Sequence, residues 1–217
     1  MRKDTSFIFS WLLACLVGFA IVSMLVTGDK TMPFDNMISG WVQSYKSDAL
    51  TSLSEFLAMV GQPKVVMIAA IAIAGLGIMT AAIFKTSSFK TIALQLVLFV
   101  TVNSFAYIGN PMLKNFFQRP RPMPYIRDYS FPSGHAMISF AFCISVAYLI
   151  SRHTVSKVSG SMAVTVGVVI TILMGLSRIY LNVHYPTDII AGFLASGFIL
   201  SFTLLLVHRF AKFVRKQ

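Results

Sequence analysis

Long apolar runs alternate with short polar segments along most of the chain, and their lengths indicate the architecture. Crossing the hydrocarbon core of a bilayer takes about 20 mostly apolar residues in a helix. Six runs approach or reach that length: residues 7–27, 65–84, 91–109, 136–150, 162–176 and 189–207. Because a membrane-embedded backbone must satisfy its own hydrogen bonds, each run is expected to be a helix. The sequence therefore predicts an all-α fold, an integral membrane bundle of six transmembrane helices.

A segment with a different pattern, residues 34–60, separates the first two runs. Its apolar side chains recur at helical spacing, whereas its charged and amide side chains fall on other faces. Trp41 and Tyr45 lie on the apolar face, which favours one or two short amphipathic helices in the membrane interface. A helix packed over the ends of the bundle has the same pattern, and both interpretations stay open.

The first run, residues 7–27, follows the basic start Arg2-Lys3, as an anchor or a signal peptide would. The run is longer than the usual apolar part of a signal peptide, and no small-x-small cleavage site clearly follows it. We therefore expect it to stay in the protein as the first span.

Composition supports a membrane protein and limits the other possibilities. Of the 217 residues 56% are hydrophobic and 12% charged, and the mean hydropathy is +0.77, far above that of ordinary soluble domains. A single membrane-embedded domain over residues 1–217 is expected. Cys15 and Cys143 both lie inside apolar runs, so a CxxC metal site is excluded.

The formal charge of +11 is unevenly distributed, and its distribution predicts the orientation. Lys and Arg favour cytoplasmic loops, so the N-terminus is placed inside and successive spans alternate. Both termini are then cytoplasmic, and ten of the eighteen basic residues lie on the inner side. Five of the other eight lie in segments 114–135 and 177–188, an outer excess that needs a functional explanation. No nucleic-acid motif is present, so nucleic acid is not an expected partner.

Three short polar pieces share the predicted outer side. They are Lys114 with Arg121-Pro122, then Pro132-Ser-Gly-His135, then Ser177-Arg178 with His184 and Asp188. Ser133 precedes an apolar run as a helix N-cap would, and the N–H groups of Gly134 and His135 would then face an anion, which Gly134 lets approach closely. Lys114, Arg121 and Arg178 would surround the same anion. The pieces predict a phosphate-binding site.

His184 and Asp188 lie one helical turn apart if the last span begins near Pro186. The carboxylate can then accept the imidazole Nδ1–H and leave Nε2 free to react. A metal site is the competing use of such residues. Three fixed cations would repel a divalent cation and attract an anion, so no metal and no other cofactor are expected.

Together these pieces resemble the signature of the type 2 phosphatidic acid phosphatase (PAP2) family, which also includes vanadium haloperoxidases. Lys-x6-Arg-Pro, Pro-Ser-Gly-His and Ser-Arg-x5-His-x3-Asp occur in the family's order over 75 positions, and the six spans extend the likeness over nearly the whole chain. The resemblance implies that His184 is a nucleophile forming a phosphohistidine. It also implies that His135 is the general acid, which next deprotonates the attacking water.

The resemblance to small bacterial members of the family implies a multi-pass protein of the cell membrane. Its expected activity is metal-independent hydrolysis of a lipid phosphate or isoprenyl diphosphate at the outer face, as in phosphatases for phosphatidylglycerophosphate, phosphatidate and undecaprenyl diphosphate. The alternatives are a phosphatase or phosphotransferase for a water-soluble phosphoester, and a non-catalytic lipid-phosphate binding or transport protein. The pair His135 and His184 argues against the last of these, and the spans have no purpose in a haloperoxidase. The sequence specifies neither the preferred lipid nor the oligomeric state.

The other polar side chains allow plainer interpretations. Arg119 and Arg127 either assist the anion or belong to a solvated loop. His153 and His208 are expected at the inner interface beside basic residues. Loop shape or substrate contact is open for three more residues: Tyr180, Asn182 and Tyr185.

Overall fold

The structure is a computed structural model that describes residues 2–85, 89–154 and 156–214, and within these ranges its regular secondary structure is helical. The helices are α1 (Arg2–Thr27), α2 (Met32–Gln43), α3 (Asp48–Val60), α4 (Pro63–Ile83), α5 (Phe89–Phe117), α6 (Gly134–His153), α7 (Lys157–Tyr180) and α8 (Pro186–Val214). The two ends of the chain, Met1 and 215–217, lie outside the described residues. Arg215 and Lys216, two of the basic residues assigned to the inner side, are among them.

Six of the described helices are long and apolar enough to cross a membrane. They are α1 from Thr5, α4, α5, α6, α7, and α8 as far as Val207. The short helices α2 and α3 occupy the segment between the first two spans. The predicted all-α architecture is confirmed, and the chain is a multi-pass membrane protein.

Helices α5 and α7 continue past the ends of their predicted apolar runs and include the first residues of two polar pieces. The third run was expected to end at Gly109, and Pro111 follows two residues later; proline lacks an N–H and breaks most helices. Instead α5 passes through Pro111 to Phe117. The Asn110 side chain donates to the Pro132 carbonyl at 3.0 Å, which ties this turn to the start of α6. Helix α7 likewise reaches Tyr180, so Ser177 and Arg178 lie in its last turn and not in a loop.

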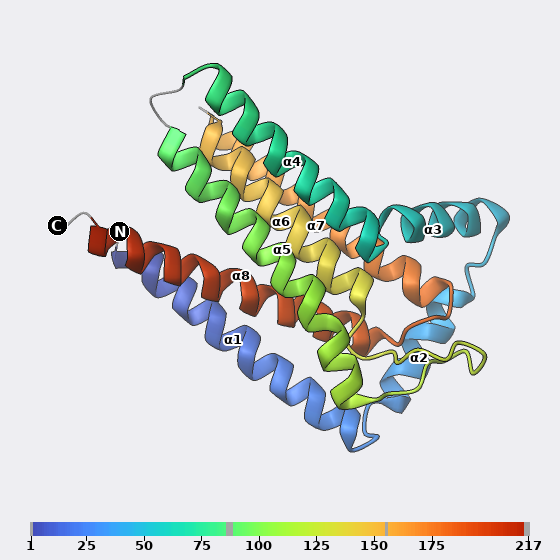
Figure 1. The fold of residues 1–217 in the computed structure, drawn as a ribbon. Helices are drawn as coiled ribbons and strands as arrows, with labels where there is room; N and C mark the ends of the chain where they lie inside the picture. Colours follow the sequence, from blue (N-terminus) through green and yellow to red (C-terminus); the bar gives the residue numbers. More distant parts are fainter. Residues whose placement is uncertain (1, 86–88, 155, 215–217) are drawn as a thin grey trace.

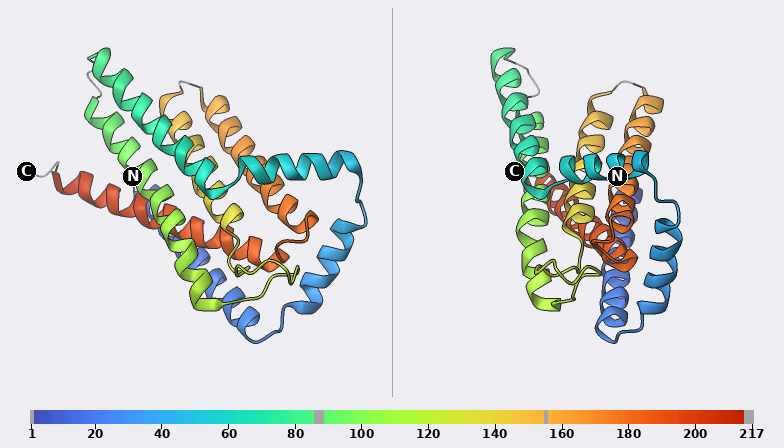
Figure 2. Two further views of the ribbon diagram at one scale, coloured as in Figure 1. Left: turned by 45° about the vertical axis from the view of Figure 1, so that its right-hand side comes forward. Right: turned by 90° about the vertical axis from the view of Figure 1, so that its right-hand side faces the viewer.

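The spans form two groups that converge at one end of the molecule. Figure 1 shows α1 beside α8, inclined to the group of α4, α5, α6 and α7, with the two termini at the end where the groups separate. Helix α8 also packs against α6 and α5, which joins the groups. Figure 2 shows α2 and α3 beside the opposite end, where the segments 118–133 and 181–185 also lie. All the predicted site residues belong to that end.

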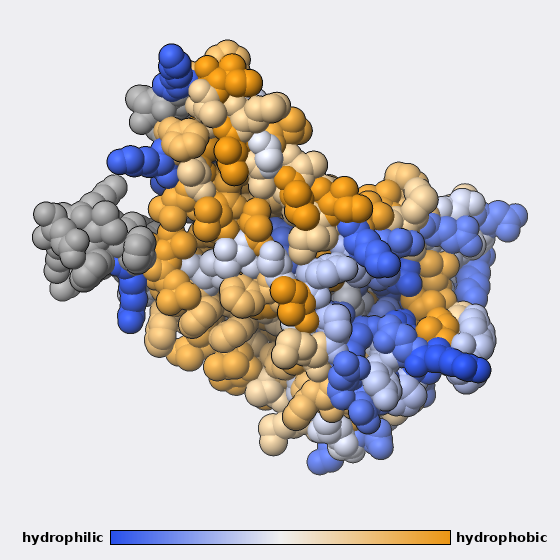
Figure 3. Space-filling model, in the orientation of Figure 1, coloured by the Kyte–Doolittle hydropathy of each residue, from blue (hydrophilic) through white to orange (hydrophobic). Residues whose placement is uncertain are grey.

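The segment containing α2 and α3 combines both interpretations of its pattern. The Tyr180 hydroxyl of α7 accepts from Ser47 N at 3.0 Å and lies 3.0 Å from Thr51 Oγ1, so the segment is attached to the bundle end. Large apolar side chains nevertheless remain exposed on it, including Met37 at 63% and Trp41 at 61%. In Figure 3 polar residues gather around this end, whereas apolar residues cover the spans. The segment therefore packs on the bundle and keeps an exposed apolar face; its place in the membrane interface stays a prediction.

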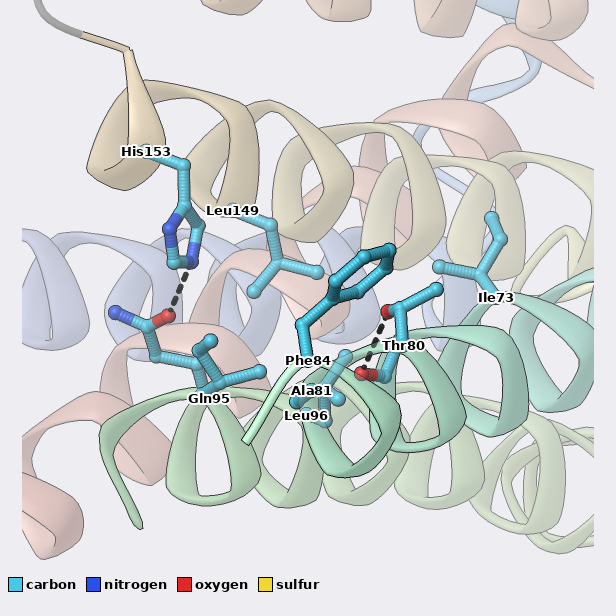
Figure 4. Close-up of a pocket in the computed structure, with 10 residues that line it drawn as sticks. Ile73, Thr80, Ala81, Phe84, Gln95, Leu96, Leu149 and His153 are labelled. Carbon is cyan, nitrogen blue, oxygen red and sulfur yellow. Dashed lines mark hydrogen bonds between the residues drawn. The ribbon is translucent and has the colours of Figure 1, made fainter. Parts of the chain in front are cut away.

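A cavity of about 460 Å³ lies away from the predicted site, between α4, α5 and α6. Its lining is mainly apolar, and its polar members include His153 and Gln95, whose Nε2 and Oε1 atoms are 2.7 Å apart (Figure 4). None of the predicted site residues lines it. His153 is exposed at the end of α6, and its place at the inner interface stays a prediction, whereas the His208 side chain lies outside the described part.

Candidate active site

Helix ends bring the predicted cations together. Lys114 lies in the last turn of α5 and Arg178 in the last turn of α7, while Arg121 lies in the segment between α5 and α6. Arg121 is close enough to interact electrostatically with both Lys114 and Arg178. We call these three residues the cation cluster. Like charges are held close together here, as a site for a multiply charged anion requires.

Arg178 is the member of the cluster with a buried donor that has no partner among the described residues. This donor is its Nε atom. A buried guanidinium donor without a partner is costly in a finished protein, because desolvation is not offset by a bond. Arg178 is therefore poised for an acceptor that comes from outside the chain.

The start of α6 provides a second set of donors. Ser133 is the N-cap, and its Oγ accepts from Ala136 N at 3.4 Å. Within the described part of the chain, no hydrogen bond occupies the N–H groups of Gly134 and His135. Free N–H groups at a helix N-terminus attract anions. We call residues Ser133 to His135 the phosphate seat, and phosphate binding there stays a prediction.

Gly134 has a packing role that the sequence did not indicate. A Cβ at this position would lie 2.8 Å from Asn110 Oδ1 of α5. Asn110 in turn is buried and bonds to the Pro132 carbonyl. The glycine therefore lets α5 approach the start of α6, whether or not a ligand also approaches there.

His184 is buried beside the cluster, and its two ring nitrogens have different partners. Nδ1 lies 3.2 Å from Asp188 Oδ2, and Nε2 lies 3.0 Å from Arg121 Nη1. Because arginine only donates, Nε2 is the acceptor and Nδ1 carries the proton. Burial lowers the pKa of His184 to about 4, assisted by Arg121 and Lys114, although Asp188 opposes the shift. The ring is thus neutral at pH 7, with a lone pair on the nitrogen nearest the cations.

Asp188 is held from several sides at the start of α8. Its Oδ2 atom also accepts from Tyr185 N at 2.9 Å, the reciprocal bond of a helix capping box. Its Oδ1 atom pairs with Arg119 Nη1 at 2.7 Å. The carboxylate is fully buried, so these bonds fix it behind His184. Asp188 O in turn accepts from Ser133 N at 3.0 Å, which joins the phosphate seat to the start of α8.

His135 lies at the start of α6, close enough to interact electrostatically with His184 and Arg178. Its Nε2 atom is 3.1 Å from the carbonyl oxygen of Ala58 in the last turn of α3. A carbonyl only accepts, so Nε2 carries a proton in this contact. The structure therefore shows a protonated ring nitrogen near the cluster, held by the amphipathic segment.

A carboxylate of the chain itself, Asp128, occupies part of the cluster. Its Oδ2 atom lies 2.6 Å from Lys114 Nζ and 2.8 Å from Arg121 Nη2. Partial burial would raise the pKa of Asp128, but the bonds to the two cations hold it below its usual value. The side chain is 60% exposed, so an incoming anion can displace it.

We expect Asp128→Asn to tighten the binding of inorganic phosphate by about two- to fivefold, because an exposed ion pair contributes up to about 1 kcal/mol. Isothermal titration calorimetry of the detergent-solubilised protein measures this affinity. Glu55→Gln, which removes an exposed negative charge from α3, serves as the control and should leave the affinity unchanged. Weaker phosphate binding in Asp128→Asn would show instead that this carboxylate orients the cations.

The fit between α8 and the phosphate seat depends on Gly192. A Cβ at this position would lie 2.9 Å from Ser133 O and 3.1 Å from Met137 N, backbone atoms that cannot rotate away. We expect Gly192→Ala to lower the free energy of unfolding by about 1–3 kcal/mol, as overpacking typically does. Thermal unfolding in detergent measures this, with Gly75→Ala as the control because its Cβ would meet nothing within 4 Å. Equal melting temperatures for the two variants would contradict this packing.

The structure thus gathers the predicted site residues at one end, and it adds residues that the sequence did not single out. Asp128 and Asn110 were not considered, and Asp35 was assigned to the polar face of an amphipathic helix. Arg119 proves to be a buried ion-pair residue and not part of a solvated loop, whereas Arg127 is exposed. Asn182 and Tyr180 bond to the α2–α3 segment and so shape the loop. In the described residues, no group of three or more His, Cys, Asp or Glu side chains is placed to hold a metal ion.

Comparison with known proteins gives a family match that includes most of the candidate site residues. The family model described as the PAP2 superfamily matches residues 92–212, more than half of the chain. Phosphatidylglycerophosphatase B of Bacillus subtilis (strain 168) is 38% identical over 90 residues, which cover 39% of this chain and 44% of that protein. Undecaprenyl-diphosphatase of Sulfolobus acidocaldarius is 32% identical over 84 residues, covering 39% of this chain and 34% of that protein. The chain thus spans less than half the length of each of these curated relatives.

The fold match extends further than the sequence matches. The crystal structure of a transmembrane PAP2-type phosphatidylglycerolphosphate phosphatase from Bacillus subtilis superposes with a TM-score of 0.75 at 25% identity. The superposition covers 93% of this chain and 96% of that one. The likeness therefore includes the helices outside the matched family region.

Proposed function

This chain belongs to the PAP2 superfamily, and we propose that it is a membrane-embedded phosphatase that hydrolyses a lipid phosphate or an isoprenyl diphosphate. One observation supports the proposal most strongly: His184 Nε2 is unprotonated and accepts from Arg121 of the cation cluster, while Asp188 holds the other side of the ring. A site that only bound phosphate would need the cations but not a neutral, oriented imidazole. The names of the relatives support a phosphorylated lipid as the substrate class.

In the first step, the substrate phosphate displaces Asp128 and takes up the bonds of Lys114 and Arg121. Arg178 and the N–H groups of Gly134 and His135 bind its remaining oxygens, and Arg121 releases Nε2 of His184. Nε2 then forms a bond to phosphorus while the bond from phosphorus to the leaving oxygen breaks. The cations stabilise the charge on the three equatorial oxygens of this transition state.

His135 provides the proton for the leaving oxygen, and it does so as the imidazolium, the form that the negative charge of the bound phosphate favours. In the structure His135 Nε2–H donates a hydrogen bond to Ala58 O, and this contact is exchanged for one with the leaving group. In the second step His135 takes a proton from a water molecule, which attacks phosphorus and breaks the bond to His184. Inorganic phosphate leaves, and His184 and His135 regain their starting protonation states.

The charge of the site supports metal independence. Three cationic side chains already supply the charge neutralisation for which other phosphoryl-transfer enzymes use magnesium. They would also repel a divalent cation in the same place. Loss of activity in chelator, restored by magnesium, would contradict this part of the proposal.

We also propose that the site faces the outside of a bacterial cell membrane and that both termini are cytoplasmic. The support is the distribution of basic residues, whose outer excess belongs to the site. Labelling of a Tyr125→Cys variant in intact cells by a membrane-impermeant maleimide tests this orientation, because Tyr125 is exposed in the segment between α5 and α6. Protection from the label until the cells are lysed would contradict it.

The substrate class is tested by comparing lipid phosphates with their short-chain, water-soluble analogues. The exposed apolar face of α2 and α3 lies beside the site, so the long-chain substrate should reach it from the membrane. We expect a higher kcat/KM for long-chain phosphatidate in mixed micelles than for a short-chain phosphate ester. The reverse order would favour a water-soluble phosphoester as the substrate.

A further inference from the structure

Arg119 lies in the same segment as Arg121 but has a different set of partners. Its guanidinium is 8% exposed and lies between two fully buried carboxylates. Nη2 is 2.7 Å from Asp35 Oδ2, and Nη1 is 2.7 Å from Asp188 Oδ1. The ring of Tyr185 covers the guanidinium, with 4.1 Å between Cζ and the ring centroid. The ion pairs outweigh the effect of burial and raise the pKa of Arg119, so the charge is permanent.

Asp35 lies in α2 of the amphipathic segment. It contacts the first turn of α8, which also carries Asp188, the hydrogen-bond partner of His184. The Oδ1 atom of Asp35 accepts from Thr187 N at 2.9 Å, and its Oδ2 atom accepts from Thr187 Oγ1 at 2.8 Å. Thr187 directly precedes Asp188 in the first turn of α8. Asp35 therefore fixes Asp188 both through Arg119 and through the backbone of α8.

The three charges have a consequence for His184. An isolated pair of Arg119 and Asp188 would be neutral, so the guanidinium charge would offset the attraction between the Asp188 carboxylate and a positively charged imidazole. With Asp35 present, the group of Asp35, Arg119 and Asp188 carries a net charge of −1 behind Nδ1. The imidazole gains positive charge when Nε2 bonds to phosphorus, so this net charge stabilises the step.

We propose that Asp35 and Arg119 are positioning residues for the nucleophile, and that α2 thereby contributes a residue to the active site. The two residues act through Asp188 and do not touch the substrate. This inference rests on the proposed phosphohistidine mechanism, because it assigns a role that matters only where His184 attacks. It differs from the expectation that Arg119 binds the anion or lies in a solvated loop.

The test compares kcat with phosphate binding in purified Asp35→Asn and Arg119→Gln proteins. We expect kcat for a lipid phosphate to fall about 10- to 100-fold in each, the usual effect of losing an outer partner of a reacting group. The inhibition constant of inorganic phosphate should change by less than about twofold, because Lys114, Arg121 and Arg178 remain. Arg119→Lys keeps the charge but not the fork that reaches both carboxylates, so its kcat should be intermediate. Arg127→Gln, an exposed arginine of the same segment, should match the wild-type protein.

Each outcome decides the proposal. Wild-type kcat in Asp35→Asn would overturn it, and so would a large rise in the phosphate inhibition constant of Arg119→Gln with kcat preserved at saturating substrate. If Arg119→Gln does not fold, the kcat of Asp35→Asn decides the question, because its Arg119–Asp188 pair stays intact. If neither folds, the kcat of Arg119→Lys decides it, and wild-type kcat there overturns the inference. A wild-type protein that releases no phosphate overturns the proposed function instead, and this inference with it.

Discussion

Replacing His184 by alanine is expected to lower the rate of phosphate release by at least about 10⁴-fold, as the loss of a nucleophile does in hydrolases that form a covalent intermediate. The substitution removes Nε2 and leaves Asp188 and Arg121 without their imidazole partner. It should also abolish the phosphoenzyme that the wild-type protein forms with a ³²P-labelled lipid. Phosphohistidine survives alkaline quenching, so alkaline gel electrophoresis measures it. The substitution should leave the binding of inorganic phosphate largely intact, because the cation cluster remains.

His153→Ala is the matched control for this experiment. His153 is exposed in the distant pocket between α4, α5 and α6 (Figure 4), so its loss should preserve the wild-type rate. His184→Gln provides a second control, because an amide fills more of the buried space than alanine and tests for unfolding. A His184→Ala protein that kept a tenth of the wild-type rate would rule out His184 as the nucleophile.

Replacing Arg178 by glutamine is expected to lower kcat by about 100- to 1000-fold, the usual cost of losing one preorganised transition-state donor. Its buried Nε has no partner within the described residues, so the guanidinium is available to the substrate. Because Arg121 repels Arg178 electrostatically, the substitution should not lower the melting temperature. Loss of rate without loss of stability distinguishes a functional cation from a structural one.

The comparison for Arg178 needs kinetics and thermal unfolding on the same preparations. Arg178→Lys should recover part of kcat, since lysine supplies the charge but not the planar fork. Arg152→Gln, which removes an exposed arginine in the last turn of α6, should leave kcat unchanged. A rate within threefold of wild type for Arg178→Gln would remove Arg178 from the proposed site.

The spans and the family were predictable because their signals are local in the sequence. The length of an apolar run determines whether it can cross a membrane, and the three motif pieces keep fixed internal spacings. The helix ends were less predictable. Pro111 carries a strong break signal, but α5 continues because this turn is packed against the start of α6.

The network behind the nucleophile could not be predicted from the sequence. Asp35 and Arg119 are 84 positions apart, and a lone acid on an amphipathic helix usually faces water. Only the packing of α2 against the start of α8 buries both side chains. The packing role of Gly134 could not be predicted either, because the atom that a Cβ there would meet belongs to Asn110 of another helix.

The most direct test of this account is phosphate release by the purified protein in the presence of EDTA. The substrates are phosphatidate, phosphatidylglycerophosphate and undecaprenyl diphosphate in mixed micelles, with the His184→Ala protein measured in parallel. We expect the wild-type protein to release phosphate from at least one of these lipids, and the variant to release none above background. Equal release by the two proteins, or none by the wild-type protein from any lipid, would contradict a metal-independent lipid phosphatase that works through His184.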